Sequence, residues 1–218
     1  PGAAAVQAAS PNYHLAAGVD KTIELARQAR DEGCDLIVFG ETWLPGYPFH
    51  VWLGAPAWSL KYSARYYANS LSLDSAEFQR IAQAARTLGI FIALGYSERS
   101  GGSLYLGQCL IDDKGEMLWS RRKLKPTHVE RTVFGEGYAR NLIVSDTELG
   151  RVGALCCWEH LTRLSKYTLY AHHEAIHIAA WPALSLYPEQ DHAHTAKVKV
   201  GPSQIYSVER PCFASLQR

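Results

Sequence analysis

The sequence predicts an α/β domain built of layers, with a mixed β-sheet rather than a barrel or a helical bundle. Three observations lead to this prediction. The chain has 218 residues, 47% of them hydrophobic, which suffices for one domain with a sizeable core. Short apolar segments alternate with amphipathic helices in the first part of the chain. A meander of strands joined by short connections follows in the middle, which adds antiparallel pairs to the sheet.

The first elements alternate between strand and helix. Residues 3–9 are small and apolar and predict a buried strand, and apolar residues then recur at helical spacing from 19 to 29. Gly33 is placed to end that helix. Residues 36–39 predict a short, fully apolar strand that leads into Glu41.

A loop and a second helix follow. Residues 42–56 contain three prolines and two glycines, which interrupt regular structure and predict a loop. Residues 75–88 have the apolar spacing of an amphipathic helix, with Asp74 or Ser75 as its N-cap.

The remaining elements are mostly strands. Residues 112–115, Asp-Asp-Lys-Gly, predict a hairpin turn, and the long polar segment 121–140 predicts a functional loop. Residues 161–173 predict a helix, and residues 188–209 a partly helical segment that Gly201-Pro202 interrupts. The predicted strands are 90–96, 104–111, 116–120, 141–144, 152–156 and 175–180.

The charge balance excludes several classes of partner. Lys and Arg total 22 against 21 Asp and Glu, a formal net charge of +1. Such a balance gives no electrostatic reason to expect a nucleic acid or an anionic membrane as partner. No apolar stretch reaches the ~18 residues that indicate a transmembrane helix, and residues 1–10 lack the basic and apolar regions of a signal peptide.

The five cysteines bear on the cellular compartment. Their number is odd, Cys156 and Cys157 are adjacent, and no Cys-x-x-Cys pair occurs. This is not the pattern of a secreted disulfide framework. We therefore expect a cytoplasmic protein in a reducing environment, with at most one or two thiols used in chemistry.

Three reactive side chains follow predicted strands in similar ways. Glu41 comes just after the strand 36–39, Lys123 follows the strand near 116–120, and Cys157 follows the strand 152–156. Ligand sites of α/β sheets collect at strand ends. A carboxylate, an ammonium and a thiol that meet there can act as base, electrostatic stabiliser and nucleophile.

The roles follow from the chemistry of the groups. A free thiol with a pKa of about 8.5 is only a few per cent ionised at neutral pH. Glu41 can take its proton, and Lys123 favours the resulting thiolate. Lys123 and the backbone N–H of Trp158 can both donate to the charge that develops on the attacked group.

Each of these residues alone also has a simpler interpretation. A glutamate after a strand is commonly a surface or capping residue, and Lys123 ends the basic run 121–123, which suits a solvated loop. A cysteine at a strand end is more often a core-filling residue than a nucleophile.

The amino-acid sequences of the three segments that contain these residues resemble the nitrilase branch of the carbon–nitrogen hydrolase superfamily. Residues 39–48, FGETWLPGYP, are similar to its glutamate motif, and residues 122–127, RKLKPT, to its lysine motif. Residues 153–160, GALCCWEH, are similar to its cysteine motif. One such match is weak, but these three occur in the order and at the separations typical of the family.

The resemblance implies a role for each site residue. Glu41 corresponds to the general base, Lys123 to the residue that stabilises the tetrahedral intermediate, and Cys157, directly before Trp-Glu, to the nucleophile. Cys156 is then a core thiol, because successive side chains of a strand point to opposite faces. Glu130 matches a second glutamate of the family that orients the lysine or assists proton transfer. A plain ion pair of Glu130 with Arg131 or Arg122 is the alternative.

The implied reaction is hydrolysis of a nitrile to a carboxylic acid and ammonia through a cysteine thioimidate and an acyl-enzyme, without metal or organic cofactor. Within this branch, the motif sequences are most similar to those of arylacetonitrilases. Trp52, Trp181 and His128 are the expected aromatic lining of the substrate pocket, with core or interface packing as their alternative. Two other hypotheses remain: an amidase of the same superfamily, and a catalytically silent assembly subunit.

The histidines raise the question of a metal site. They gather at residues 172, 173 and 177 and at residues 192 and 194, but their spacing is not that of a zinc site. We expect polar helix-end or interface histidines.

The resemblance covers residues 4–209. It implies a single domain over residues 1–218 with the four-layer α-β-β-α sandwich of nitrilases, incomplete at its C-terminus because family domains are longer. It also implies a homo-oligomer built from dimers that can extend into spirals or filaments. The aromatic loop 49–53 and the helices near 161–173 and 188–209 are the expected contact surfaces.

Overall fold

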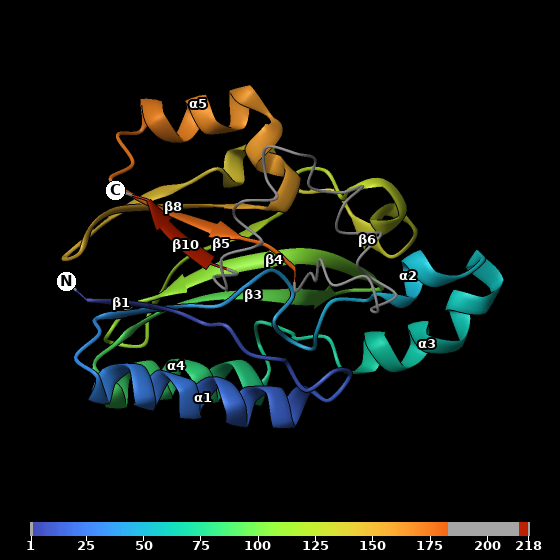
Figure 1. Cartoon of the computed structure of the whole chain (residues 1–218), viewed down its shortest axis with the longest axis horizontal. Helices are drawn as coiled ribbons and strands as arrows, with labels where there is room; N and C mark the ends of the chain where they lie inside the picture. The colour runs from blue at the N-terminus through green and yellow to red at the C-terminus, as the bar shows by residue number, and fades with distance from the viewer. Residues whose placement is uncertain (1, 183–213, 218) are drawn as a thin grey trace.

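Two β-sheets lie face to face between helices in the computed structural model, which describes residues 2–182 and 214–217 (Figure 1). Helices α1 (Leu15–Asp31) and α4 (Ala76–Leu88) cover the outer face of the first sheet. Helix α5 (Arg163–Ala171) covers the outer face of the second sheet. The order of layers is therefore α-β-β-α, which confirms the predicted fold class.

The first sheet is mixed. Its order is β1-β2-β3-β4-β5, with β6 paired to β4. The pairs β1–β2 and β2–β3 are parallel, whereas β3–β4 and β4–β5 are antiparallel. Its strands are β1 (Ala3–Ala5), β2 (Leu36–Val38), β3 (Phe91–Ser100), β4 (Ser103–Ile111), β5 (Met117–Arg122) and β6 (Phe134–Gly135).

The second sheet has the order β10-β9-β8-β7. Strands β8 and β9 are parallel, and β7 and β10 pair antiparallel at the two edges. Its strands are β7 (Val144–Thr147), β8 (Gly150–Cys156), β9 (Ile176–Ala180) and β10 (Ala214–Gln217).

Apolar side chains fill the three spaces between the layers. The first space, between α1, α4 and the first sheet, contains Val19, Ile81 and Ile92. The second space, between the sheets, contains side chains from both: Leu36, Val38, Phe91, Ala93, Leu110, Trp119, Val152, Ala154 and Ile178. In the third space Leu155 of β8 meets Leu169 of α5. Burial of apolar area on both faces fixes the sheets relative to the helices.

Two capping residues, the predicted Ser75 and also Gly89, determine where α4 begins and ends. The Ser75 side chain accepts a hydrogen bond from the backbone N–H of Phe78. Gly89 ends the helix in the left-handed conformation, with a φ of 61°, which costs glycine little.

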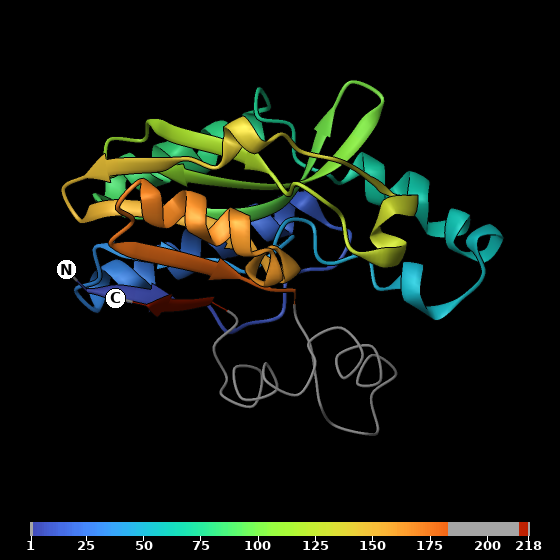
Figure 2. The same ribbon diagram turned by 90° about the horizontal axis from the view of Figure 1, so that it is seen from above.

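The segment after β2 differs from the predicted loop. It contains a cis Leu44–Pro45 peptide bond, the short helix α2 (His50–Leu53) and the longer helix α3 (Pro56–Ala68). Pro56 stands at the first position of α3, where its missing N–H is not needed. Figure 2 shows α2 and α3 projecting from one end of the sheets, away from β1 and β10.

Other boundaries shift by a few residues. The first strand is shorter than the predicted 3–9, and β7 begins where the predicted strand 141–144 ends. The long loop after β5 contains the 3₁₀ helices η1 (His128–Thr132) and η2 (Ala139–Asn141). The predicted helix 188–209, with the histidines at 192 and 194, lies outside the described residues.

None of the helices in residues 2–182 or 214–217 combines the length and apolar character needed to cross a bilayer.

Candidate active site

The three residues singled out in the sequence follow the C-terminal ends of strands in the two sheets. Glu41 lies just beyond β2, Lys123 directly follows β5, and Cys157 directly follows β8 and begins the 3₁₀ helix η3 (Cys157–Leu161). The backbone N–H of Glu41 donates to the carbonyl of Trp181 at 3.0 Å, one residue beyond β9. Cys156 is paired with Ala180 at the end of β9. The ends of β2, β8 and β9 therefore meet.

Lys123 is held between two carboxylates. Its Nζ donates to Glu41 Oε1 at 2.8 Å and to Glu130 Oε2 at 2.9 Å, and all three side chains are buried. The alternative partners of Glu130 are engaged elsewhere: Arg122 forms an ion pair with Glu98, and Arg131 donates to the carbonyl of Pro126. Glu130 is thus an ion-pair partner of Lys123.

Glu130 accepts further hydrogen bonds that hold it as a carboxylate. The Tyr47 hydroxyl donates to its Oε1 at 2.6 Å, and the backbone N–H of Thr127 donates to its Oε2 at 2.6 Å. Burial, and next the charge of Glu130, raise the pKa of Tyr47 well above its ordinary value, so the phenol keeps its proton. Donors to a carboxylate stabilise its charged form, so these contacts favour the charged form of Glu130.

The backbone at Cys157 lies in a region that non-glycine residues rarely adopt. Its φ is +48°, and Cys157 is buried. Thr42, next to Glu41, has a φ of +50°, and His128 has one of +49°. Each of the three motif segments therefore contains or adjoins a left-handed residue, and such conformations cluster at functional sites.

Cys156 behaves as the expected core thiol. Its side chain is buried. Burial, and then the charges of Glu41 and Glu159, raise the pKa of the Cys156 thiol well above its ordinary value. The protonated thiol is a poor nucleophile.

A buried ion pair joins the segments that contain Lys123 and Cys157. Arg121 binds Glu159 in two contacts, Nη1 to Oε2 at 2.9 Å and Nη2 to Oε1 at 2.7 Å. Glu159 also accepts from the backbone N–H groups of Leu124 and Cys156, both at 2.8 Å. Burial alone would raise the pKa of Glu159, but the charge and hydrogen bonds of Arg121 hold that pKa below its ordinary value.

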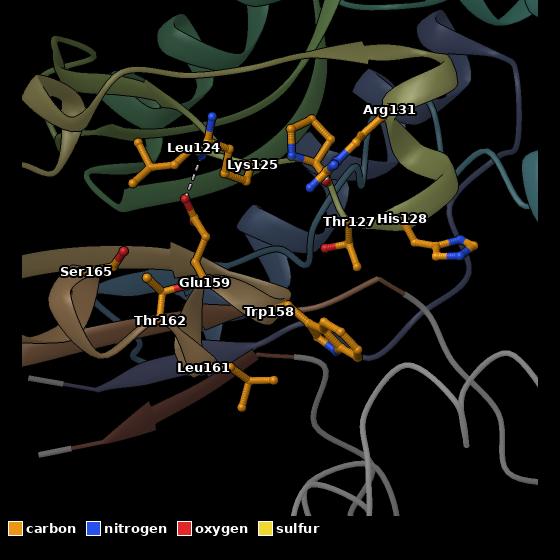
Figure 3. A pocket seen from close by; sticks show the side chains of 11 residues that line it. Leu124, Lys125, Thr127, His128, Arg131, Trp158, Glu159, Leu161, Thr162 and Ser165 are labelled. Atoms are coloured by element: carbon orange, nitrogen blue, oxygen red, sulfur yellow. Dashed lines mark hydrogen bonds between the residues drawn. The ribbon is translucent and has the colours of Figure 1, made fainter.

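A cavity of about 670 Å³ opens beside these segments (Figure 3). On one side it is lined by residues of the loop after Lys123, including Leu124, Thr127 and His128. On the other side it is lined by residues that follow Cys157, including Trp158 and Leu161. The cavity therefore lies beside the residues that immediately follow Lys123 and Cys157.

A second cavity, of about 110 Å³, adjoins the other side of the site. Its lining includes Glu41, Thr42, Tyr47, Phe49 and Trp181. The carboxylate of Glu41 is thus carried on a segment that borders a small, aromatic space.

The structure divides the three residues predicted for a substrate pocket into two groups, Trp52 with His128 and Trp181 apart from them. His128 lines the larger cavity, and Trp181 lines the smaller one. Trp52 stacks on His128, with ring centroids 5.6 Å apart, and its Nε1 donates to the Tyr47 hydroxyl at 3.0 Å. Their contact with a substrate remains a prediction.

The described residues contain no group of three or more His, Cys, Asp or Glu side chains that could hold a metal ion. His172 and His173 are exposed at the end of α5, whereas His177 lies in β9 and pairs with Glu174.

Sequence reasoning did not identify Tyr47, Arg121 and Glu159 as parts of the site. Arg121 could have been found, because it stands two residues before Lys123 and residues two apart on a strand share a face. The partner of Tyr47 follows from the packing of a loop against the segment at 127–132, and nothing in the local sequence indicates it.

Comparison with known proteins agrees with the geometry. The carbon–nitrogen hydrolase family model matches residues 2–201. An arylacetone-specific nitrilase of Alcaligenes faecalis is 90% identical over 97% of this chain and 59% of its own length. A nitrilase of Pseudomonas syringae pv. syringae is 53% identical over 96% of this chain and 62% of its own length. The chain thus spans about three fifths of these relatives.

Among solved structures, a mutant of the Nesterenkonia AN1 amidase from the nitrilase superfamily aligns with a TM-score of 0.67. The alignment covers 90% of this chain and 69% of that chain, at 17% sequence identity. At this sequence identity, the alignment shows that the two proteins share a fold and shows nothing more.

Proposed function

The chain belongs to the carbon–nitrogen hydrolase family, and from this premise we propose that it hydrolyses a nitrile to a carboxylic acid and ammonia. The observation that carries the proposal is the buried set of Lys123, Glu41 and Glu130 beside the strand end that bears Cys157. A buried cation between two carboxylates leaves one negative charge in excess, and this excess favours transfer of a thiol proton to Glu41.

The first step forms the covalent bond. Glu41 takes the proton of the Cys157 thiol, and the thiolate attacks the nitrile carbon. The C–N triple bond becomes a double bond, and its nitrogen takes the proton back from Glu41 to give a thioimidate. Lys123 and the backbone N–H of Trp158 donate to the negative charge that develops on the attacked group.

Two waters complete the reaction. Glu41 removes a proton from the first water, which adds to the thioimidate carbon, and passes that proton to the nitrogen. Glu41 then takes the proton of the new hydroxyl and passes it to the nitrogen, so that ammonia leaves as the C=O bond forms. The resulting thioester reacts with a second water, which releases the carboxylic acid and returns the thiol. Loss of the thiol instead of ammonia from the tetrahedral intermediate gives an amide.

In this mechanism Glu130 positions the ammonium group of Lys123. Its contacts with Lys123, Tyr47 and the Thr127 N–H fix the position of the ammonium group. A fixed donor stabilises developing charge better than a mobile one, because no reorganisation is needed during the reaction.

An aromatic or arylacetonitrile substrate suits the surroundings. Trp181 and Phe49 border the cavity next to Glu41, and Trp158 borders the larger cavity. The relative at 90% identity is named as arylacetone-specific. Trp52 and His128 form the next aromatic layer.

The matched variants Cys157→Ser and Cys156→Ser test the function. We expect the wild type to release ammonia and acid from phenylacetonitrile, and Cys157→Ser to reduce release at least about a thousandfold. In Cys156→Ser the hydroxyl can still accept the backbone N–H of Glu159, as the Cys156 side chain does in the wild type. Its release of ammonia and acid should therefore stay within a few-fold of wild type. Equal turnover by wild type and Cys157→Ser would refute the proposal, and faster hydrolysis of phenylacetamide than of its nitrile would favour an amidase.

The proposal also covers the domain organisation, the oligomeric assembly and the cellular compartment of the protein. Residues 1–218 act as one carbon–nitrogen hydrolase domain. Large apolar side chains stand exposed on and before α5, namely Leu161, Leu164, Tyr167 and Tyr170, and an apolar stripe of this kind supports a homo-oligomer contact. No disulfide joins cysteines within the described residues, which is compatible with the cytoplasm.

A further inference from the structure

A chain of hydrogen bonds leads from a buried carboxylate to the backbone of Cys157. Glu174, just before β9, meets His177 Nδ1 through both oxygens, at 2.9 and 2.8 Å. His177 Nε2 lies 2.9 Å from His160 Nε2. His160 Nδ1 lies 2.6 Å from the carbonyl oxygen of Cys157. None of these three side chains belongs to the site described above.

The number of hydrogens that these hydrogen bonds require can be counted. Three contacts join Glu174, His177, His160 and the carbonyl, and each contact needs one hydrogen. Two neutral imidazole rings bring only two N–H groups between them. All three contacts are therefore hydrogen bonds only when the group holds one hydrogen more than two neutral rings supply.

The tautomer of His160 follows from its surroundings. Burial is the largest cause that lowers the pKa of His160 to about 4, so His160 is neutral, and its contact with the Cys157 carbonyl places its hydrogen on Nδ1. His177 Nε2 then donates to His160 Nε2, and His177 Nδ1 faces Glu174, whose side chain is only 2% exposed.

The fold makes room for Glu174. A Cβ at position 153 would collide with Glu174 Oε1, and Gly153 of β8 leaves that space open. The carboxylate is therefore packed directly against the strand that ends at Cys156.

The hydrogen bond to the Cys157 carbonyl also orients the next N–H group. The peptide bond is planar and trans, so the N–H of Trp158 points opposite to the C=O of Cys157. His160 pulls that carbonyl toward itself and thereby sets the direction of the Trp158 N–H. A donor at the carbonyl further polarises the peptide and strengthens its N–H as a donor.

His160 also contacts the segment that positions Glu41. Its ring stacks on Trp181 at a centroid distance of 5.4 Å and an interplanar angle of 17°. The Trp181 carbonyl accepts the backbone N–H of Glu41. One imidazole thus contacts both the Cys157 segment and the Glu41 segment.

We propose that Glu174, His177 and His160 form a positioning relay that aims the Trp158 N–H at the charge developing on the substrate. The relay rests on the proposed function, since it serves that reaction, but its protonation state can be tested without turnover. Glu174 and His177 keep the hydrogen of His160 on Nδ1, and His160 keeps the peptide oriented.

Two amide variants separate the relay from simple support of the loop. His160→Asn places an amide N–H where Nδ1 stands, whereas His160→Gln places its amide where Nε2 stands and leaves the Cys157 carbonyl without that donor. The full chain is assayed with phenylacetonitrile for kcat and KM. In parallel, the rate of alkylation of Cys157 by iodoacetamide is followed by mass spectrometry. His172→Gln, at an exposed histidine, is the matched control.

The relay predicts a split between the two measurements. Alkylation by iodoacetamide creates no anion for the Trp158 N–H to stabilise, so its rate in His160→Gln should stay within about twofold of wild type. The kcat of His160→Gln should fall about tenfold or more, with KM little changed, because one oriented donor is weakened. His160→Asn should recover most of the lost kcat. Equal losses of kcat and alkylation rate, or no loss of kcat in His160→Gln, would overturn the relay.

Nitrogen NMR of isotope-labelled histidine tests the tautomer of His160 without turnover. We expect His160 to show the signature of a neutral ring with hydrogen on Nδ1, because its Nε2 accepts from His177. A wild-type His160 with its hydrogen on Nε2 contradicts the relay. A His160 with its hydrogen on Nδ1 in a protein that hydrolyses no nitrile supports this hydrogen-bond arrangement while refuting the proposed function.

Discussion

At the scale of single residues, the site depends on how buried charges are shared. Lys123 contacts Glu41 and Glu130, and Tyr47 and the Thr127 N–H contact Glu130 from the other side. Each carboxylate is thereby given a different environment. The three donors on Glu130 keep it charged, and the proposed mechanism assigns proton transfer to Glu41.

Tyr47→Phe tests this division of roles. The variant removes the hydroxyl that donates to Glu130 and accepts from Trp52. We expect a loss of roughly 1–2 kcal/mol in the free energy of unfolding, and a fall in kcat of about tenfold as Lys123 loses its fixed position. Urea unfolding and nitrile turnover measure the two effects, with Tyr138→Phe, at an exposed tyrosine, as control. Unchanged kcat in Tyr47→Phe would show that Glu130 does not need this donor.

His160 predicts a stability that depends on pH. Its pKa in the folded protein is about 4, below its ordinary 6.5, so the unfolded chain binds more protons between these values. Stability from this group is therefore complete above about pH 6.5 and declines as the pH falls toward 4, by roughly 3 kcal/mol in all. Chemical unfolding across this range should give a steeper decline for wild type than for His160→Asn. If the free energy of unfolding declined with pH equally in both proteins, the lowered pKa of His160 would be contradicted.

The motif residues could be predicted from the sequence, but most of their partners could not. Three motifs in order place Glu41, Lys123 and Cys157, and the matching glutamate places Glu130. Tyr47 and His177 reach the site through packing between loops and strands that are far apart in the chain, so no local pattern indicates their contacts.

At the scale of elements, the Arg121–Glu159 ion pair joins β5 of the first sheet to η3 after β8 of the second. Glu159 also holds the backbone N–H groups of Leu124 and Cys156. The loops that follow Lys123 and Cys156 are therefore fixed relative to each other by one carboxylate. Small movements between the sheets would otherwise separate Cys157, the proposed nucleophile, from Lys123, the cation proposed to stabilise the reaction.

Breaking this pair from one side should be strongly destabilising. Arg121→Met leaves Glu159 buried without its cation, and Glu159→Leu leaves Arg121 buried without its anion. We expect each to lose about 3–5 kcal/mol of unfolding free energy, and the double variant to lose less than the sum of the two. Urea unfolding of the four proteins gives the coupling. Additive losses in the double variant would mean that the two side chains do not stabilise each other.

The elements that the sequence predicted well are those with a strong apolar pattern. Helices α1 and α4 bury a regular apolar face, and the cap at Ser75 is as expected. Helix α3 was not located, because only Ser59 and Tyr66 are buried along its length, which leaves little periodicity to detect. Strand β7 is a polar edge strand, Val-Ser-Asp-Thr, that contributes little apolar signal.

At the scale of the whole molecule, α5 presents large apolar side chains on its outer face. Leu164 and Tyr167 of α5 are 76% and 68% exposed. Exposure of large apolar side chains on one helix face is costly in water and typical of a surface that another chain covers.

Charge on this face should weaken self-association. We expect Leu164→Glu combined with Tyr167→Glu to lower the molar mass measured by light scattering after size-exclusion chromatography, because burying two carboxylates in an apolar contact is unfavourable. Leu60→Glu, at an exposed leucine of α3, serves as control. A wild-type monomer, or an unchanged mass in the α5 variant, would rule out this face as a contact.

The layered fold itself could be predicted because the motifs specify the family and the family specifies the layers. What the sequence could not supply is the way the two sheets bring the ends of β2, β5 and β8 together. That arrangement depends on the apolar space between the sheets, where side chains such as Phe91, Trp119 and Ile178 pack from both sides.

The covalent intermediate tests the central claim most directly. Wild-type protein is mixed with phenylacetonitrile, quenched with acid within the first turnovers, digested, and the peptide with both adjacent cysteines is fragmented in the mass spectrometer. The proposed chemistry predicts an added thioimidate or acyl group on Cys157 that disappears as acid and ammonia are released. Turnover with the added group on Cys156, or with no adduct on either sulfur while the Cys157→Ser variant remains active, would contradict it.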